Sequence, residues 1–223
     1  MNIPENYRAL KASVAAAAKN ANRDPRDVLL LAVTKSVDLP QMQTLYDLGV
    51  RHFAENREPE LLRKTATLPK DIIWHFIGPL QSNKVRKVVK NAQVIHALDS
   101  LALIERVDRI CGEENRHPEV MLEINISGEA SKGGFSVAEA LPATQLAASC
   151  KNIRLTGLMT MAPNHAEKKV LQQVFGGLAA LRDRLAKELD LPLPALSMGM
   201  SGDFETAIAC GATVVRIGSA LFV

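Results

Sequence analysis

Leu29-Leu-Leu-Ala-Val33 is a short apolar run that ends in the polar residues Thr34-Lys35-Ser36. Such a run is typical of a strand that is buried on both faces of a parallel sheet. A helical pattern follows over residues 40–48 and ends at Gly49, and the next apolar segment is His52-Phe-Ala54. These residues therefore predict one strand–helix–strand unit with parallel strands.

The same alternation is predicted along the rest of the chain. The expected strands are residues 29–33, 52–54, 72–77, 93–97, 119–124, 153–159, 195–197 and 213–217. The expected helices are residues 4–19, 40–48, a polar stretch ending near 64, then 80–90, 101–114, 137–150, 167–189 and 203–210. Eight units in 223 residues, at about 28 residues each, favour an α/β fold with a single (β/α)8 TIM barrel and an extra N-terminal helix. A doubly wound open sheet is the alternative, and we expect residues 1–223 to form one domain.

Composition excludes several classes of protein. Hydrophobic residues make up 47% and charged residues 23% of the chain, which is ordinary for a globular protein. No apolar run is long enough to cross a bilayer, and Met1–Glu5 lacks the pattern of a signal peptide. Cys111, Cys150 and Cys210 are too widely spaced for a disulfide scaffold or a cysteine-based zinc motif. We therefore expect a cytoplasmic protein with no membrane or metal partner.

Two segments near the end of the chain predict a phosphate site. Barrel enzymes often bind phosphate with the loops after strands seven and eight. Here those loops contain Ser201-Gly202-Asp203, just before an expected helix, and Gly218-Ser219. Backbone amides and hydroxyl groups at such positions suit a dianion. The alternative is that these residues are ordinary turn and cap residues.

Lys35 ends the most apolar strand, and in a closed barrel this strand pairs with the strand that carries Arg216. A lysine that is partly desolvated at the barrel mouth, near another cation, has a lowered pKa and can attack an aldehyde to form a Schiff base. A solvated loop lysine is the alternative. A phosphate site, a reactive lysine and an arginine at one mouth match what pyridoxal 5'-phosphate (PLP) requires.

The chain also resembles a known family, the pyridoxal phosphate homeostasis proteins (YggS/PROSC). The resemblance covers nearly the whole chain in matching order. Its motifs are Ala32-Val-Thr-Lys-Ser36, His75-Phe-Ile-Gly-Pro-Leu-Gln-Ser-Asn-Lys84, Asn125-Ile-Ser127, Gly157-Leu-Met159, Leu196-Ser-Met-Gly-Met-Ser201 and Val215-Arg-Ile-Gly218. The family has a fold-type III PLP-binding barrel that is similar to the N-terminal domain of alanine racemase, without that enzyme's second domain.

The resemblance implies a role for each matching residue. Lys35 would hold PLP as a Schiff base, and Ser201 with the backbone of Gly218-Ser219 would hold its phosphate. Arg216 would face the pyridine nitrogen, and Asn56 would lie near the ring. No metal ligand and no catalytic residue is implied.

Four positions depart from the family pattern. The family's Phe-Gly-Glu-Asn-Tyr is Phe53-Ala-Glu-Asn-Arg57 here, so Ala54 needs an extended backbone and Arg57 replaces an aromatic residue. Gly202 stands where an acidic residue is common. The sequence ends at Phe222-Val223, so we expect the last turn of the barrel to be trimmed or completed by the N-terminal helix.

The residues favour a carrier over an enzyme. A permanently charged Arg216 disfavours a protonated pyridine nitrogen, and racemisation also needs acid–base groups on both faces of the substrate carbon. The chain has only Tyr7 and Tyr46 as tyrosines, both on expected helices, and we expect His75 to be packed inside the barrel. We therefore expect an intracellular PLP carrier or reservoir that serves apo PLP-dependent enzymes, as a monomer. A PLP-dependent amino-acid racemase of low activity is the alternative.

Two basic features have other interpretations. The helix with Lys84, Arg86, Lys87 and Lys90 would suit a nucleic-acid partner, but its spacing is that of a solvated helix face and aromatic residues are scarce. Lys132, in Ser131-Lys-Gly-Gly134, is either a loop lysine or a second phosphate ligand that gates release of PLP.

Overall fold

The computed structural model describes residues 2–129 and 132–222, and their parallel strands close into a barrel of eight. Each strand pairs with the next in chain order, and the last pairs with the first. The strands are β1 Leu29–Val33, β2 His52–Glu55, β3 Ile73–Phe76, β4 Val94–Leu98, β5 Glu119–Glu123, β6 Arg154–Met159, β7 Ala195–Met200 and β8 Val214–Ile217. The predicted (β/α)8 barrel is confirmed, and the open-sheet alternative is wrong.

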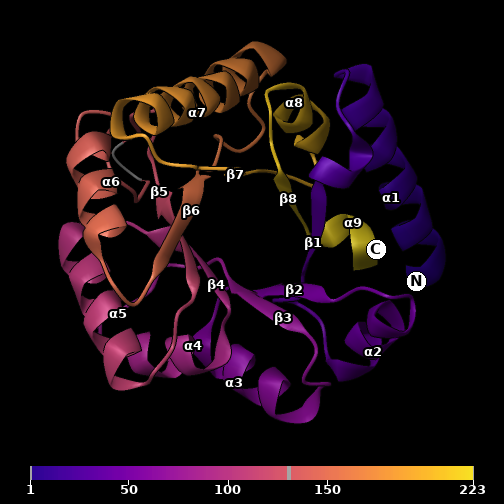
Figure 1. The fold of residues 1–223 in the computed structure, drawn as a ribbon. Helices are drawn as coiled ribbons and strands as arrows, with labels where there is room; N and C mark the ends of the chain where they lie inside the picture. Colours follow the sequence, from indigo (N-terminus) through magenta and orange to yellow (C-terminus); the bar gives the residue numbers. More distant parts are fainter. Residues whose placement is uncertain (1, 130–131, 223) are drawn as a thin grey trace.

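Helices surround the strands in an outer ring (Figure 1). They are α1 Ile3–Asn20, the short 3-10 helix η1 Pro25–Asp27, α2 Leu39–Asp47, α3 Glu58–Thr67, α4 Val85–Asn91, α5 Leu101–Glu113, α6 Ala140–Ser149, α7 Lys168–Leu189, α8 Phe204–Ala209 and α9 Ser219–Phe222. Among the described helices, none has both the length and the apolar character that a bilayer crossing requires.

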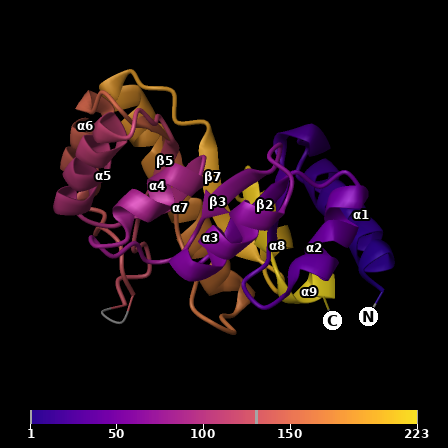
Figure 2. The same cartoon turned by 90° about the horizontal axis from the view of Figure 1, so that it is seen from below.

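The extra N-terminal helix α1 packs against α8 and α9, at the side of the barrel where β1 meets β8 (Figures 1 and 2). The side chain of Asn6 donates to the carbonyl of Leu221 at 3.3 Å, which ties the first helix to the last. The short helix α9, which the sequence pattern does not predict, therefore packs against α1. The expectation of a last turn that is trimmed or completed by α1 stays a prediction. Val223, on which the expectation of a trimmed last turn partly depends, lies outside the described residues.

Most boundaries differ from the predicted ones by one or two residues, and the larger differences include those of β7, α4 and α6. Strand β7 runs to Met200 rather than ending at residue 197, because Gly199 adopts a φ of +91° and lets the strand continue past a register shift. Helix α4 begins at Val85 rather than residue 80, because the preceding residues form a turn in which Lys84 N donates to the carbonyl of Gln81. Helix α6 begins at Ala140 rather than residue 137. The residues before it form a turn in which Glu139 N donates to the carbonyl of Ser136 at 3.1 Å.

The interior of the barrel holds two small apolar clusters that are separate from the large core shared by the strands and helices. One cluster contains Leu31, Val33, Ala54 and Val214, from β1, β2 and β8. The other contains Val94, Ala97, Met121 and Met159, from β4, β5 and β6. Four buried polar side chains come from β3, β4, β7 and β8, namely His75, His96, Ser197 and Arg216.

Candidate functional site

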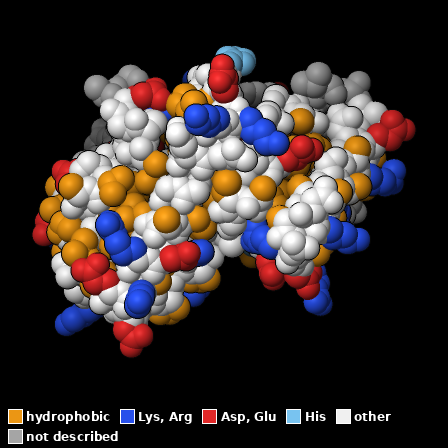
Figure 3. Space-filling view, turned by 90° about the horizontal axis from the view of Figure 1, so that it is seen from above, with side chains coloured by type: hydrophobic (Ala, Val, Ile, Leu, Met, Phe, Trp, Pro, Cys, Tyr) orange, Lys and Arg blue, Asp and Glu red, His pale blue; other side chains and the backbone are white. Residues whose placement is uncertain are grey.

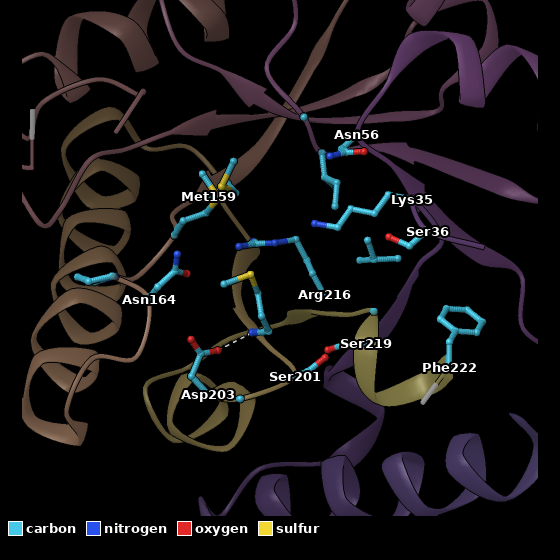
Figure 4. Close-up of a pocket in the computed structure, with 18 of the residues that line it drawn as sticks. Lys35, Ser36, Asn56, Met159, Asn164, Ser201, Asp203, Arg216, Ser219 and Phe222 are labelled. Carbon is cyan, nitrogen blue, oxygen red and sulfur yellow. Dashed lines mark hydrogen bonds between the residues drawn. The ribbon is translucent and has the colours of Figure 1, made fainter. Parts of the chain in front are cut away.

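A cavity of about 860 Å³ opens at the carboxyl-terminal ends of the strands. The loops that follow β1, β2, β3, β6, β7 and β8 line it. The structure brings all the sequence-predicted site residues together in this cavity: Lys35, Asn56, Ser201, Arg216, Gly218 and Ser219. Figure 4 shows Lys35 and Arg216 reaching into its centre, with Ser201 and Ser219 on one side.

Lys35 lies in the turn after β1, and its side chain points toward Arg216 (Figure 4). The two residues meet because β1 pairs with β8, with Leu31 opposite Arg216. The expectation that Lys35 is partly desolvated is wrong, because the residue lies beyond the barrel rim and is exposed to the open cavity. Its amine is therefore free to meet a ligand from solvent.

A buried ion pair anchors the backbone just before Lys35. The ammonium of Lys64 on α3 lies 2.6 Å from Oε1 of Glu55 on β2, and both side chains are fully buried. The same ammonium donates to the carbonyl of Thr34 at 2.7 Å, and the Thr34 hydroxyl donates to Glu55 Oε1 at 2.6 Å. The turn that carries Lys35 is thereby fixed to two neighbouring elements.

Asn56 follows β2 at the rim of the cavity. Its Oδ1 atom is buried and has no hydrogen-bond partner among the described residues. Gly78 makes this position possible, because a Cβ atom there would lie 2.2 Å from the carbonyl oxygen of Asn56. The nearby Ala54 lies within β2 and has the extended backbone that the sequence departure requires, while Arg57 is exposed and does not line the cavity.

The loops after β7 and β8 meet at one side of the cavity. The amide of Ala220, the residue after Ser219, donates to Oγ of Ser201 at 3.4 Å, and both serines line the cavity (Figure 4). Helix α9 begins at Ser219, so its first amides have no carbonyl within the helix to bond. Ser201 itself lies in a turn before α8 rather than at its cap, which is Asp203.

Arg216 is a buried cation without a carboxylate partner. It donates from one terminal nitrogen to Oγ of Ser197 at 2.7 Å and from the other to the carbonyl of Thr160 at 3.0 Å. No carboxylate of the described residues lies within ion-pair distance of it. Burial lowers the pKa of Arg216 to about 10, and the more distant Asp203 and Glu123 oppose this shift. The guanidinium is therefore still charged at neutral pH.

Sequence reasoning missed several residues that line the cavity. Glu123, at the end of β5, is buried, and burial together with the charge of Asp99 raises its pKa, against the opposing effect of Arg216. Its position at the end of β5, directly after the apolar residues 120–122, could have indicated that it lines the cavity. Residues 163–166 and Phe222 also line the cavity, and no local pattern distinguishes them from ordinary loop residues.

Lys132 does not line the cavity. Its ammonium lies 3.2 Å from the carbonyl of Met161, a residue that does line it, and 3.2 Å from the carboxylate of Glu129. Ser131, the first residue of the glycine-containing segment, lies outside the described residues. The gating role of Lys132 stays a prediction.

The basic side chains of α4 are paired with acidic side chains of the neighbouring helices. Lys84 and Lys87 both contact Glu58 at the start of α3, at 3.3 and 3.1 Å. Lys90 lies 2.9 Å from Glu114 after α5, which also pairs with Arg86. On a different face of the molecule, which Figure 3 draws, basic and acidic side chains are intermixed as well. This pairing favours the interpretation of α4 as a solvated helix face.

Neither tyrosine lines the cavity, and both lie on the outer helices. The hydroxyl of Tyr46 donates to Asp71 at 2.8 Å. His75 is buried inside the barrel, as predicted, and is bonded to two other histidines. Within the described residues, no group of three or more His, Cys, Asp or Glu side chains could hold a metal ion.

The closed barrel and the cavity at its carboxyl-terminal mouth define a single-barrel protein of the alanine racemase N-terminal domain class. A family model of that description, "Alanine racemase, N-terminal domain", matches residues 6–223. Within this class, the chain belongs to the pyridoxal phosphate homeostasis protein family. The protein of that name from Synechocystis sp. is 42% identical over 89% of this chain and 92% of its own length. The one from Aquifex aeolicus is 35% identical over 100% of this chain and 98% of its own length.

Solved structures show the same likeness. PipY of Synechococcus elongatus, solved with PLP bound, is 36% identical, with a TM-score of 0.84 over 94% of this chain and 100% of its own. Alanine racemase of Clostridium difficile is 14% identical, with a TM-score of 0.75 over 94% of this chain and 55% of its own. This second likeness concerns the fold alone.

Proposed function

We propose that this protein binds PLP in the cavity at the carboxyl-terminal ends of the strands, and acts as a PLP carrier or reservoir in vitamin B6 homeostasis. One observation carries the proposal. The amine of Lys35 faces the same cavity as Arg216, a buried cation with no carboxylate within ion-pair distance among the described residues. A cavity with a lysine amine and an arginine that can donate a further hydrogen bond suits a ligand that has both an aldehyde and a ring nitrogen that accepts.

The remaining groups around the cavity fit the parts of PLP. The hydroxyl groups of Ser201 and Ser219 and the backbone at Gly218-Ser219 would hold the phosphate. Arg216 would face the pyridine nitrogen, and the unpartnered Oδ1 of Asn56 would lie near the ring. PLP supplies an aldehyde that reacts reversibly with amines, and Lys35 would hold it as a Schiff base.

The same residues favour storage over catalysis. Arg216 donates hydrogen bonds and keeps its charge, so a pyridine nitrogen that faces it stays without a proton and withdraws electrons weakly. Racemisation also needs a second acid–base group opposite Lys35. Neither Tyr7 nor Tyr46 lines the cavity. Low racemase activity is the alternative, and clear Lys35-dependent turnover of D- and L-amino acids would favour it.

The carrier proposal includes partners. We propose that PLP passes from the open cavity to apo PLP-dependent enzymes, and that the carrier works as a cytoplasmic monomer. The opening of the cavity at the strand ends supports direct release, because Lys35 is exposed there.

The visible absorbance spectrum with PLP, before and after borohydride reduction, tests the proposal in wild type and Lys35→Ala. We expect a yellow band in the wild type that reduction locks onto the peptide containing Lys35, and no such band in the variant. Lys70→Ala is a matched control, because Lys70 is a surface lysine bonded to the carbonyl of Thr65, away from the cavity. The absence of a lysine-dependent band in folded protein would overturn the proposal.

A further inference from the structure

Three histidines and a serine form a continuous line of hydrogen bonds through the inside of the barrel. Nδ1 of His52 lies 2.9 Å from Nε2 of His75, and Nδ1 of His75 lies 2.8 Å from Nε2 of His96. Nδ1 of His96 lies 2.8 Å from Oγ of Ser197, which accepts from Arg216 at 2.7 Å. The line begins at the half-buried His52, the first residue of β2, and ends at the wall of the cavity.

The backbone of the barrel is shaped to allow this line. The pairing of β4 with β5 shifts register between Ile95 and Leu98, around His96. The pairing of β7 with β8 shifts register between Ser197 and Met200. Such irregularities re-aim side chains and are enriched beside functional sites. His96 and Ser197 are both fully buried, where a polar side chain without a partner would be costly.

The guanidinium of Arg216 fixes the direction of every bond in the line. Arginine has donors and no acceptor, so Oγ of Ser197 must accept from it. Among the described residues, Nδ1 of His96 is the acceptor within reach of the Ser197 hydrogen. His96 therefore carries its own hydrogen on Nε2 and donates to Nδ1 of His75. By the same logic, His75 donates from Nε2 to Nδ1 of His52.

This direction requires that the histidines are neutral, and their surroundings favour that state. Burial lowers the pKa of His75 to about 3, and the neighbouring His52 adds to this effect. Burial also lowers the pKa of His96 well below its ordinary value, and His75 and the charge of Arg216 add to that shift. Burial also lowers the pKa of His52, against the opposing charge of Glu119. A neutral imidazole has one donor and one acceptor, which is what each inner position of the line uses.

We propose that Ser197, held by the line of His96, His75 and His52, is a positioning residue for Arg216. The two terminal nitrogens of Arg216 are bonded to Ser197 and to the carbonyl of Thr160, and Nε has no hydrogen-bond partner among the described residues. Fixing the guanidinium in this way leaves the Nε hydrogen available to the ligand in the cavity. The inference rests on the proposed function, because it assigns the ligand of Arg216 as the ring of PLP.

The first test needs no cofactor. Nitrogen-15 NMR of the histidine rings in the cofactor-free protein reports which nitrogen carries the hydrogen. We expect His75 and His96 to be neutral at pH 7 with hydrogen on Nε2, while the exposed His165 serves as an internal control with averaged tautomers. Hydrogen on Nδ1 of either inner histidine would overturn the inference, whether or not PLP binds.

The second test uses the PLP-loaded protein and compares Ser197→Ala with wild type. Loss of the hydroxyl frees the guanidinium to rotate, so we expect about tenfold weaker PLP binding and a shifted pH dependence of the PLP absorbance. We expect Ser197→Thr, which keeps the hydroxyl, to restore both. Thr156→Val is a matched control, because it removes a buried strand hydroxyl that bonds to the carbonyl of Val120, outside the line.

Two outcomes of the second test separate the proposals. Wild-type affinity and absorbance in folded Ser197→Ala would overturn the positioning role. Failure of the wild type to bind PLP would overturn the proposed function, and the NMR result would still decide the hydrogen-bond line. If Ser197→Ala does not fold, His96→Leu replaces it, since it removes the acceptor that orients the Ser197 hydroxyl, with the same expected effects.

Discussion

Lys64 and Arg216 are both buried cations, but their hydrogen-bond partners differ in charge. Lys64 lies behind the turn that carries Lys35, and its charge is matched by the carboxylate of Glu55 at 2.6 Å. Arg216 lies inside the barrel, and its hydrogen-bond acceptors are the uncharged oxygens of Ser197 and Thr160. A buried charge is costly unless it is paired. The comparison therefore indicates that Lys64 stabilises the fold, whereas Arg216 carries a charge that a ligand can use.

The two sites also differ in access to solvent. The Lys64 side chain is fully buried and does not line the cavity, so no ligand reaches it. Arg216 is also buried, but it forms part of the cavity wall. The carboxylates of Asp203 and Glu123 act on it from beyond ion-pair distance. Arg216 therefore brings a positive charge to the cavity wall, because the oxygens that accept its hydrogen bonds are uncharged.

The largest expected effect comes from Lys64→Met. This variant leaves Glu55 as a buried carboxylate without its cation. The other oxygen of that carboxylate, Oε2, already has no partner among the described residues. Removing one partner of a buried pair costs about 3–5 kcal/mol of unfolding free energy. Urea unfolding followed by circular dichroism measures it.

The double variant Lys64→Met, Glu55→Gln serves as the control. It removes both charges, so we expect it to recover part of the lost stability. A Lys64→Met variant as stable as wild type would contradict the view that this pair holds the turn before Lys35.

The next effect in size is the loss of stability between pH 7 and pH 5. The folded pKa of His75 is about 3, far below its ordinary value of 6.5. The unfolded chain therefore binds protons that the folded chain does not, and stability falls as the pH drops below 6.5. From pH 6.5 to pH 5 the loss is about 2 kcal/mol for a histidine that stays neutral, and His96 shifts in the same direction. Glu123, with its raised pKa, opposes part of this loss.

His75→Gln isolates that contribution, because glutamine keeps a donor and an acceptor but does not titrate. Chemical unfolding at several pH values should show a shallower decline for the variant than for the wild type. Equal slopes for the two proteins would mean that His75 takes up protons while folded, which would break the hydrogen-bond line to Arg216.

Much of the site was predictable because strand ends are visible in the sequence. Lys35, Arg216 and the Ser201 and Gly218-Ser219 segments each follow or end an apolar run, and parallel closure brings such ends to one mouth. The histidine line had a weaker signal: His52, His75 and His96 are 23 and 21 positions apart, which matches the length of one strand–helix unit. Neither signal reveals that the three rings touch.

The rest depends on details that spacing does not determine. Ser197 lies beside Arg216 because of a register shift in the pairing of β7 with β8, and no sequence pattern predicts a register shift. Lys35 is exposed because it lies in the loop after the strand. The apolar strand before it had suggested a partly desolvated side chain. Side-chain pairs such as Lys64 and Glu55 join segments through tertiary packing, which local periodicity does not report.

The smallest expected effect, and the sharpest contrast with Lys64, comes from Arg216→Met in the cofactor-free protein. The variant loses two hydrogen bonds, but it also removes a buried charge that no carboxylate of residues 2–129 and 132–222 pairs with, so the two effects on stability oppose each other. We expect the unfolding free energy to change by less than about 1 kcal/mol in urea unfolding. Saturating PLP should then stabilise the wild type by mass action, and the variant much less. A loss as large as that of Lys64→Met would mean that Arg216 supports the fold itself, and its charge would then no longer point to a ligand.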